Sequence, residues 1–442
     1  MNHKIGITQG VGLVVASMIG SGLFVSTGFM LGEGLTSTEI LLEWFIGGLW
    51  AFSGAILYSH IAQTTPLDGG EPVYIRKYLS ESLGYVITLL TIVVGFICPI
   101  VFDGLVTGNY IAAMIGWEHP QLIASCIIIF FVGTNYITDK NQLSDFVQQL
   151  LVVIKLCSVV GIIVIGFWWL DKTSTYTPYA LSFDSTRVNT LLGQQYWVVY
   201  AFSGFNAAIY IAERFNEPTK QVKKSIYYGL SLVFICYMLV NHIFVQIIMV
   251  TDIPDTALAD GFNQITLCHL LFQKIFQSSY SNIISLLMVF IFLSSISVMF
   301  QLVLPICTSL SPSIQDDTDK IQLTKLCVLA VGGLALLLIW FTSIAKILAS
   351  ISFIIYFVSS LTMSIILLNR LPQESSFKIR VLSLGYIAIS LLLLTYGMIS
   401  SDMLHSGGFV LVLIIGWLIQ KKMIHKRSTS ETANRQHHKY NT

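Results

Sequence analysis

Long apolar blocks separated by short polar breaks are the feature of this sequence that most constrains its fold. A helix needs roughly 20 mostly apolar residues to cross the hydrocarbon core of a bilayer. By that rule the sequence predicts an all-α membrane protein with twelve transmembrane helices. The predicted spans are Ile7–Leu31, Ile40–Gln63, Val86–Ile115, Gln121–Ile137, Phe146–Leu170, Tyr196–Ala212, Ile226–Thr251, Asn282–Leu304, Leu326–Thr342, Ile344–Leu368, Val381–Ser400 and Phe409–Lys422. The ninth and tenth spans are separated around Phe341–Ser343, because one helix over both would overshoot the bilayer.

The composition excludes several classes of protein. Only 11% of the 442 residues are charged and the mean hydropathy is +0.75, whereas soluble domains carry about 25% charged residues. A net charge of +1 argues against nucleic-acid binding, which needs a basic face. The seven cysteines are odd in number and follow no metal-ligand spacing. With no catalytic motif such as H-E-x-x-H, we expect no enzyme, no cofactor and no metal site.

Lysine and arginine are distributed unequally between the predicted loops. If the N-terminus is cytoplasmic, 19 of the 24 basic residues lie on the inner side, four lie on the outer side, and Lys155 lies inside a span. Basic residues favour the cytoplasmic side of a membrane. The sequence therefore predicts one multi-pass domain over residues 1–424 with both termini in the cytoplasm. Residues 425–442, which are basic and rich in hydroxyl groups, are predicted to be a disordered cytoplasmic tail.

Two predicted spans contain helix-weakening residues near the middle of the membrane. The first span has Gly20-Ser21-Gly22, with Gly20 roughly 20 Å from the start of the helix, and the sixth has Ser203-Gly204. Each glycine costs a helix about 1 kcal/mol relative to alanine. Close packing through small residues would explain either break alone. Breaks in spans one and six together predict inverted five-helix repeats, over about 7–170 and 190–370, with two extra helices over 380–424.

The breaks have a definite chemistry. Unwinding frees backbone groups that lipid cannot satisfy, so a break must be buried in protein or face a ligand. The half-helix that starts near Ser21 and Gly22 presents N–H groups and a positive dipole end, which suit a carboxylate. The half-helices that end near Ile19 and Phe202 present carbonyls, which suit an ammonium group. An α-amino acid offers both groups on one carbon.

Three motifs in this sequence resemble those of the amino acid–polyamine–organocation (APC) transporters. Gly20-Ser21-Gly22-Leu23-Phe24 resembles the G-S-G-I-F signature, and Pro66 to Arg76 is similar to the P-x-x-G-G-x-x-x-Y loop after the second helix. Ala201 to Asn206, followed by Glu213 and Glu217-Pro218, resembles A-F-x-G-x-E with E-x-x-x-N-P downstream. The resemblance implies a LeuT-like fold and transport by alternating access, in which spans one, two, six and seven rock against the other helices.

The resemblance also implies a set of substrate-binding residues. Ser21 and Gly22 would hold a substrate carboxylate, while the carbonyls of Ile19, Phe202 and Ser203 would hold its amine. The rest of the predicted site comprises Gly20, Leu23, Tyr200, Gly204, Asn206 and Met299, together with Asp103, considered below. Of these, Tyr200 falls where arginine–agmatine antiporters carry an aromatic lid. Asn206 departs from the family pattern, in which many members have a glutamate.

Lys155 lies inside the fifth predicted span, about 13 Å from its start. A lysine at the centre of a membrane helix costs roughly 2.5–3.5 kcal/mol, so it should face the protein interior and have a partner. A purely structural lysine is one interpretation. The APC resemblance suggests another, in which the Lys155 ammonium replaces a sodium ion beside the unwound part of span one and couples transport to protons.

Two acidic residues inside predicted spans have more open roles. Asp103 in span three is either a wall of the substrate site that prefers a cationic side chain, or a structural partner of a hydroxyl group or of Lys155. Glu43 lies near the outer end of span two, where we expect it to reach the interface.

Taken with the family resemblance, these features predict a secondary active transporter of amino acids in the cell membrane. Its expected partners are a small-molecule substrate, protons or an exchanged counter-substrate, and membrane lipids. A polyamine or amine antiporter is an alternative, and it is favoured if Asp103 faces the pocket. A non-transporting nutrient sensor in the membrane would share every feature of the sequence.

Overall fold

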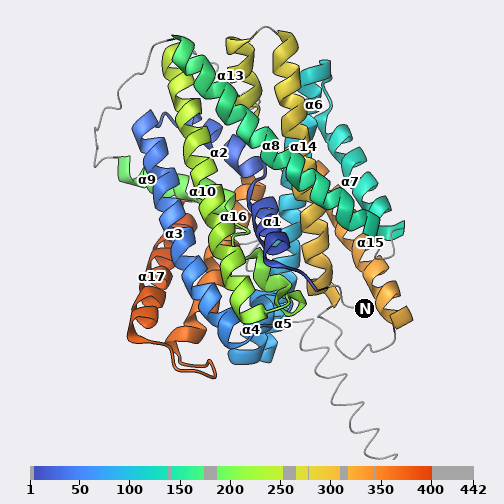
Figure 1. Ribbon diagram of the computed structural model, residues 1–442, viewed down its shortest axis with the longest axis vertical. Coiled ribbons are helices and arrows are strands. Elements are labelled where there is room, and N and C mark those ends of the chain that lie inside the picture. The colour runs from blue at the N-terminus through green and yellow to red at the C-terminus, as the bar shows by residue number, and fades with distance from the viewer. Residues whose placement is uncertain are drawn as a thin grey trace, which may run out of the picture.

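The protein is a bundle of helices in the computed structural model (Figure 1), which describes residues 4–137, 142–173, 187–251, 265–276, 278–308, 317–342 and 344–400. Within these residues, ten helical stretches are long and apolar enough to cross a membrane. The broken sixth span adds a helix of 15 residues, so eleven of the twelve predicted spans have a helical counterpart. The twelfth, Phe409–Lys422, and the tail 425–442 lie outside the described residues.

The described residues form a series of helices. Their bounds are α1 (Ile7–Met18), α2 (Ser21–Gly32), α3 (Ser37–Thr64), α4 (Glu71–Tyr78), α5 (Glu81–Leu90), η1 (Thr91–Ile97), α6 (Cys98–Ile115), α7 (Pro120–Ile137), α8 (Gln142–Thr173), α9 (Val188–Phe202), η3 (Ala207–Tyr210), η4 (Ala212–Arg214), α10 (Pro218–Thr251), α13 (Leu267–Ile275), α14 (Ser278–Thr308), α15 (Asp317–Phe341), α16 (Ile344–Leu367) and α17 (Phe377–Ser400). The separation of α15 from α16 agrees with the predicted division of the ninth and tenth spans.

Several helix starts follow directly from local sequence. The Thr36 hydroxyl accepts a hydrogen bond from Glu39 N, and Glu39 Oε2 accepts one from Thr36 N at 2.7 Å, which together cap α3. Pro120 and Pro218 are the first residues of α7 and α10. Proline is suited to this position because a backbone N–H there would have no acceptor within the helix. The third span begins at Glu81, earlier than predicted, and includes the π-helical segment η1 before Pro99.

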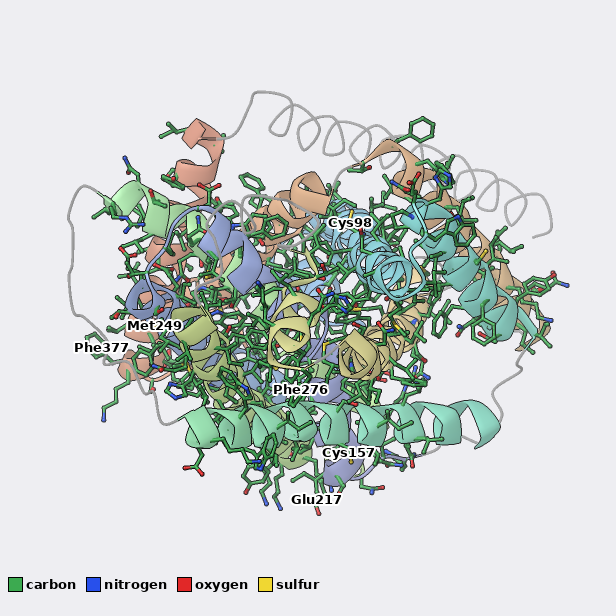
Figure 2. The ribbon with its side chains drawn as sticks, turned by 90° about the horizontal axis from the view of Figure 1, so that it is seen from above. Cys98, Cys157, Glu217, Met249, Phe276 and Phe377 are labelled. Atoms are coloured by element: carbon green, nitrogen blue, oxygen red, sulfur yellow. The ribbon has the colours of Figure 1, made fainter. Side chains whose placement is uncertain are left out.

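The first span occupies the centre of the bundle. In its most apolar stretch 89% of the residues are buried, whereas the corresponding share is 22–28% in α7, α8, α15 and α17. The long helix α8, which carries Cys157, runs obliquely along one side of the bundle (Figures 1 and 2). In the interior, α1 packs against α10, α10 packs against α3, and α6 packs against α14. The peripheral helices therefore present apolar side chains to lipid, while α1 and α2 are surrounded by protein.

At one end of the bundle, the chain just before α1 lies next to the loop before α4 and the segment 211–216. Ile5 N donates a hydrogen bond to Arg214 O at 2.9 Å, and Asn216 N donates one to Ile5 O at 3.2 Å. An isolated bridge joins Asp68, just before α4, to Ile211. We call this the N-terminal end of the bundle; α4 and α5 lie there in Figure 1.

Candidate functional site

The first span is broken at Ile19 and Gly20, as the sequence predicts. Both residues have extended backbone angles between α1 and α2. The freed Ile19 carbonyl oxygen accepts hydrogen bonds from Lys155 Nζ at 2.6 Å and from Ser295 Oγ at 3.0 Å. Ala16 O, one turn earlier, accepts from the same ammonium at 2.9 Å. Carbonyl groups that lipid would leave unsatisfied are thus bonded by side chains of α8 and α14.

Lys155 is fully buried beside this break. Its third acceptor is Ser295 Oγ at 2.9 Å, so each of the three N–H groups of the ammonium has an oxygen partner. The lysine faces the protein interior, and its partners are hydroxyl and backbone oxygens. Its geometry suits a positive charge next to unwound backbone.

On the other side of the break, the start of α2 binds a carboxylate of the protein itself. Asp103 Oδ1 accepts hydrogen bonds from Ser21 N at 3.2 Å and from the Ser21 hydroxyl. Asp103 comes from α6 and is 2% exposed. The N-terminus of a helix attracts anions, and here that position is filled by an aspartate. Of the roles left open for Asp103, the structure shows the bond to a hydroxyl group.

The second break follows α9 at Ser203 and Gly204. The N–H of Ser203 donates to Tyr200 O at 2.9 Å, after which the chain leaves the helix. Gly204 has φ +90°, and a Cβ there would lie 2.9 Å from the carbonyl oxygen of Ser17. Both the backbone angle and this close approach to α1 require glycine.

A hydroxyl group joins the two breaks. Tyr237 Oη, from α10, lies 2.6 Å from Met18 O and 2.8 Å from Ala201 O. Met18 is the last residue of α1, and Ala201 is the last residue but one of α9. Sequence reasoning missed Tyr237, because one tyrosine in an apolar helix carries no local signal.

The predicted site residues fall into two groups. One group is packed: Tyr200 lies edge-on to Phe102 with ring centroids 5.0 Å apart, and a Cβ on Gly22 would lie 2.8 Å from the Cα of Ala201. Ile19, Gly20, Ser21, Leu23 and Phe202 are also buried. The other group, Ser203, Gly204, Asn206 and Met299, lines a cavity of about 80 Å³.

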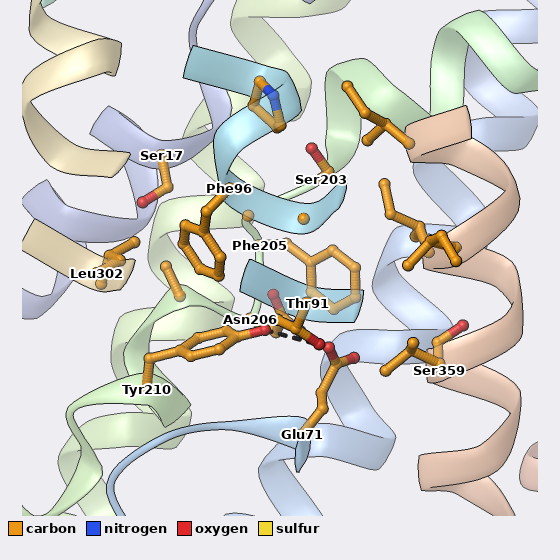
Figure 3. A pocket seen from close by; sticks show the side chains of 18 of the residues that line it. Ser17, Glu71, Thr91, Phe96, Ser203, Phe205, Asn206, Tyr210, Leu302 and Ser359 are labelled. Carbon is orange, nitrogen blue, oxygen red and sulfur yellow. Dashed lines mark hydrogen bonds between the residues drawn. The ribbon is translucent and has the colours of Figure 1, made fainter. Parts of the chain in front are cut away.

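The cavity reaches from the breaks to the N-terminal end of the bundle (Figure 3). Ser17 and Ser203 line it near the breaks, and Glu71 and Tyr210 line it near the α4 loop. Glu71 was missed as a site residue, although its loop supplied one of the family motifs, because the motif does not say which side chains enter the bundle.

Glu43 corrects one expectation. We expected this residue to reach the interface, but it is 3% exposed and accepts a hydrogen bond from the side-chain amide of Gln195 on α9. The packing of α9 against α3 covers the carboxylate.

Comparison with known proteins gives the family. Residues 5–304, which include both breaks, Lys155 and Glu71, match the family model described as amino acid permease. The chain belongs to the amino acid permease family. Because this family, of the APC superfamily, consists of transport proteins, the match confirms the resemblance expected from the motifs and places the chain in a family of transporters, not of enzymes.

The permease has similar but distant relatives. It is 24% identical over 261 residues to the b(0,+)-type amino acid transporter 1 of Homo sapiens, covering 57% of this chain and 53% of that one. It is 25% identical over 259 residues to the serine/threonine exchanger SteT of Bacillus subtilis, covering 57% of each. The third relative is the large neutral amino acids transporter small subunit 2 of Mus musculus, at 22% over 253 residues, 54% of this chain and 47% of that one. The permease therefore spans about half the length of the relatives it matches.

The permease is also similar to a solved structure. A Na⁺-coupled sialic acid symporter, in a substrate-bound outward-open state, matches with a TM-score of 0.58 at 13% identity over 91% of each chain. At that identity the likeness concerns the fold alone. It confirms an all-helical membrane protein with the LeuT-like fold that the resemblance implied.

Proposed function

We propose that this permease is a secondary active transporter that carries amino acids across the cell membrane by alternating access. The observation that carries the proposal is the meeting of two broken segments at Tyr237, next to a cavity lined by Ser17, Ser203 and Gly204. Broken helices that meet inside a bundle are the usual substrate site of such carriers. Family membership supports the same activity, as do relatives named as amino acid transporters and exchangers.

The proposal includes an architecture. Twelve spans would form two inverted repeats, over about 7–170 and 190–370, followed by two further helices, with both termini in the cytoplasm. The matching positions of the breaks in spans one and six support the repeats. The concentration of basic residues on one side supports the orientation, which makes the N-terminal end of the bundle cytoplasmic.

We assign the coupling role to Lys155. Its ammonium holds the carbonyls of Ala16 and Ile19 in the way that a bound metal ion would. Release of a proton from Lys155 would remove its charge and one of its three N–H donors, which weakens its bonds to the two carbonyls and links the state of the break to protons. The same fold also allows coupling by exchange of a second amino acid. The relative named as a serine/threonine exchanger supports this second form of coupling.

Substrate binding at the break requires Asp103 to move. An amino acid carboxylate that bonds the Ser21 N–H must displace the Asp103 carboxylate, because two like charges repel strongly in a site of low dielectric. Asp103 would then act as an internal competitor of the substrate.

The same contact favours a second candidate function, the transport of amines. A substrate without a carboxylate would leave Asp103 on Ser21 and would use its negative charge to balance the ammonium group. In that case the permease would be an amine or polyamine antiporter.

Flux measurements test these proposals. The full chain is reconstituted into proteoliposomes, and uptake of labelled amino acids and amines is compared with and without unlabelled substrate inside. Accumulation of an amino acid that depends on pH or on internal substrate supports the first function, and uptake restricted to amines supports the second. Ligand binding without any flux contradicts both and supports a nutrient sensor.

A further inference from the structure

Glu71 is a buried carboxylate at the N-terminal end of the cavity. It is the first residue of α4 and is 9% exposed. The Tyr58 hydroxyl donates a hydrogen bond to Oε1, and the Tyr210 hydroxyl donates one to Oε2 at 3.1 Å. In Figure 3 the side chain points from α4 toward the middle of the pocket. One donor on each oxygen suits the ionised form of the carboxylate.

The loop before α4 holds this carboxylate against the second broken segment. Gly69 and Gly70 have φ +101° and +68°, angles that favour glycine. Gly69 N donates to Tyr210 O at 3.0 Å, and a Cβ on Gly70 would lie 2.4 Å from the Tyr210 ring. Asp68 accepts a hydrogen bond from Glu213 N at 2.8 Å. The position of Glu71 is therefore fixed by several contacts to η3 and η4.

The charge of Glu71 has no cationic partner within the described part of the chain. The titratable groups that face it are three tyrosines, Tyr58 on α3, Tyr210 on η3 and Tyr386 on α17. Burial raises the pKa of Glu71, and the hydrogen bonds from Tyr58 and Tyr210 lower it in part. A buried carboxylate without a counter-charge is costly, so a cation in the cavity would be bound favourably.

A second polar group in the cavity lacks a partner. Thr91 Oγ1 is buried and makes no hydrogen bond to any described residue, although Thr91 lines the same cavity from η1. Buried hydroxyl groups are normally hydrogen-bonded. Asn206 adds an amide to the lining, and Glu71 is the one charged side chain among the described lining residues. The cavity thus combines one negative charge with neutral hydrogen-bonding groups.

We propose that Glu71, with Thr91 and Asn206, forms a second binding station for the primary ammonium group of the transported molecule, between the breaks and the N-terminal end of the bundle. An ammonium group has three N–H donors, which match a carboxylate oxygen, a hydroxyl oxygen and an amide oxygen. The role in transport rests on the proposed function, whereas the binding chemistry does not.

Thermal unfolding of the purified full chain tests the station with three small probes that each have three carbon atoms. Propylamine carries the ammonium group, and 1-propanol and propionate replace it with a neutral or a negative group. We expect propylamine alone to raise the melting temperature of the wild type at neutral pH. Glu71→Gln should weaken this binding about 30-fold or more, the usual effect of removing one partner of a buried charge pair. Glu43→Gln removes a buried carboxylate outside the cavity, and this variant should bind propylamine as the wild type does.

Three results would overturn the station: no effect of propylamine, an equal effect on Glu71→Gln, or stabilisation by sodium chloride that propylamine does not reproduce. If Glu71→Gln does not fold, Glu71→Asp takes its place, and unchanged propylamine affinity in that variant counts against the proposal. Flux assays report separately on the proposed function. If propylamine binds at Glu71 but no amino acid or amine is transported, the binding station is supported and the proposed transport function is refuted.

Discussion

The ammonium nitrogen of Lys155 lies 2.6 Å from the carbonyl oxygen of Ile19, at the point where the first span is broken. Ser295 Oγ lies 2.9 Å from the same nitrogen and 3.0 Å from the same oxygen, which closes a triangle of hydrogen bonds. Through this triangle α8 and α14 both hold the unwound backbone. A change in the charge of Lys155 would therefore be felt directly at the break.

Replacing Lys155 with alanine tests this link. Lys155→Ala removes three charge-assisted hydrogen bonds and leaves buried carbonyls unsatisfied, so we expect stability to fall by about 3 kcal/mol. If Lys155 couples transport to protons, the remaining uptake should be the same at acidic and neutral pH. Uptake into proteoliposomes at both pH values measures this. Lys172→Ala is the matched control, since Lys172 lies in the last turn of the same helix with its ammonium over the Trp168 ring.

Uptake by Lys155→Ala that keeps both the wild-type rate and the wild-type pH dependence would contradict the coupling role. A lower uptake rate with unchanged pH dependence would show that Lys155 has a structural role only.

Asp103→Asn separates the two candidate substrates. The variant keeps a hydrogen-bond acceptor near Ser21 but removes the negative charge from the start of α2. We expect an amino acid to bind about tenfold more tightly, because its carboxylate no longer competes with another. An amine substrate would bind more weakly, because its counter-charge is lost. Affinities from thermal shifts with an amino acid and its decarboxylated amine, measured side by side, decide between these opposite changes.

Tyr237→Phe removes the hydroxyl that bonds both broken segments. Because Met18 O and Ala201 O lose a shared donor in the interior, we expect a loss of about 1–3 kcal/mol in stability and a slower transport rate. Melting temperature and uptake are compared with those of Tyr228→Phe on the same helix, where the side chain is 59% exposed. Equal effects of the two substitutions would show that Tyr237 has no special role at the breaks.

The fold could be predicted from local sequence because its determinants are local. Apolar length marks the spans, and the glycine and serine residues at 20–22 and 203–204 mark the breaks, where the structure has them. The separation at Phe341–Ser343 followed from bilayer thickness. Such features need no knowledge of which helices are neighbours.

The details of the site depend on neighbours, so the sequence could not supply them. Asp103 bonds Ser21 across 82 positions of the chain and Tyr237 bonds Met18 across 219. Glu43 was expected at the interface because its position along the helix is near the end, but the packing of α9 covers it. Glu71 enters the cavity only because the glycine turn lies against Tyr210.

Gly22→Ala tests how closely the two broken segments must approach. A Cβ on Gly22 would lie 2.8 Å from the Cα of Ala201, a backbone atom that cannot rotate away. Overpacking of this kind costs about 1–3 kcal/mol, and we expect uptake to fall with it. Gly12→Ala, one turn of α1 and more away, is the control, because its Cβ would be 4.0 Å from the nearest atom, on Val152. Tolerance of Gly22→Ala equal to that of Gly12→Ala would mean that the segments are less tightly packed.

The stability of the permease should depend on pH through Glu71. Burial raises the pKa of this carboxylate above its ordinary value, so the folded protein holds the proton more tightly than the unfolded chain does. Stability from this group is therefore greatest at low pH, and it is lost as the pH rises from the ordinary glutamate value through the folded-state pKa. Glu71→Gln removes this dependence, so the stability of the wild type relative to the variant should fall from acidic to neutral pH. Melting temperatures over that range measure the difference, with Glu217→Gln as a surface control for the loss of one carboxylate; a difference that rises with pH would mean that Glu71 is more stable in its ionised form in the folded protein.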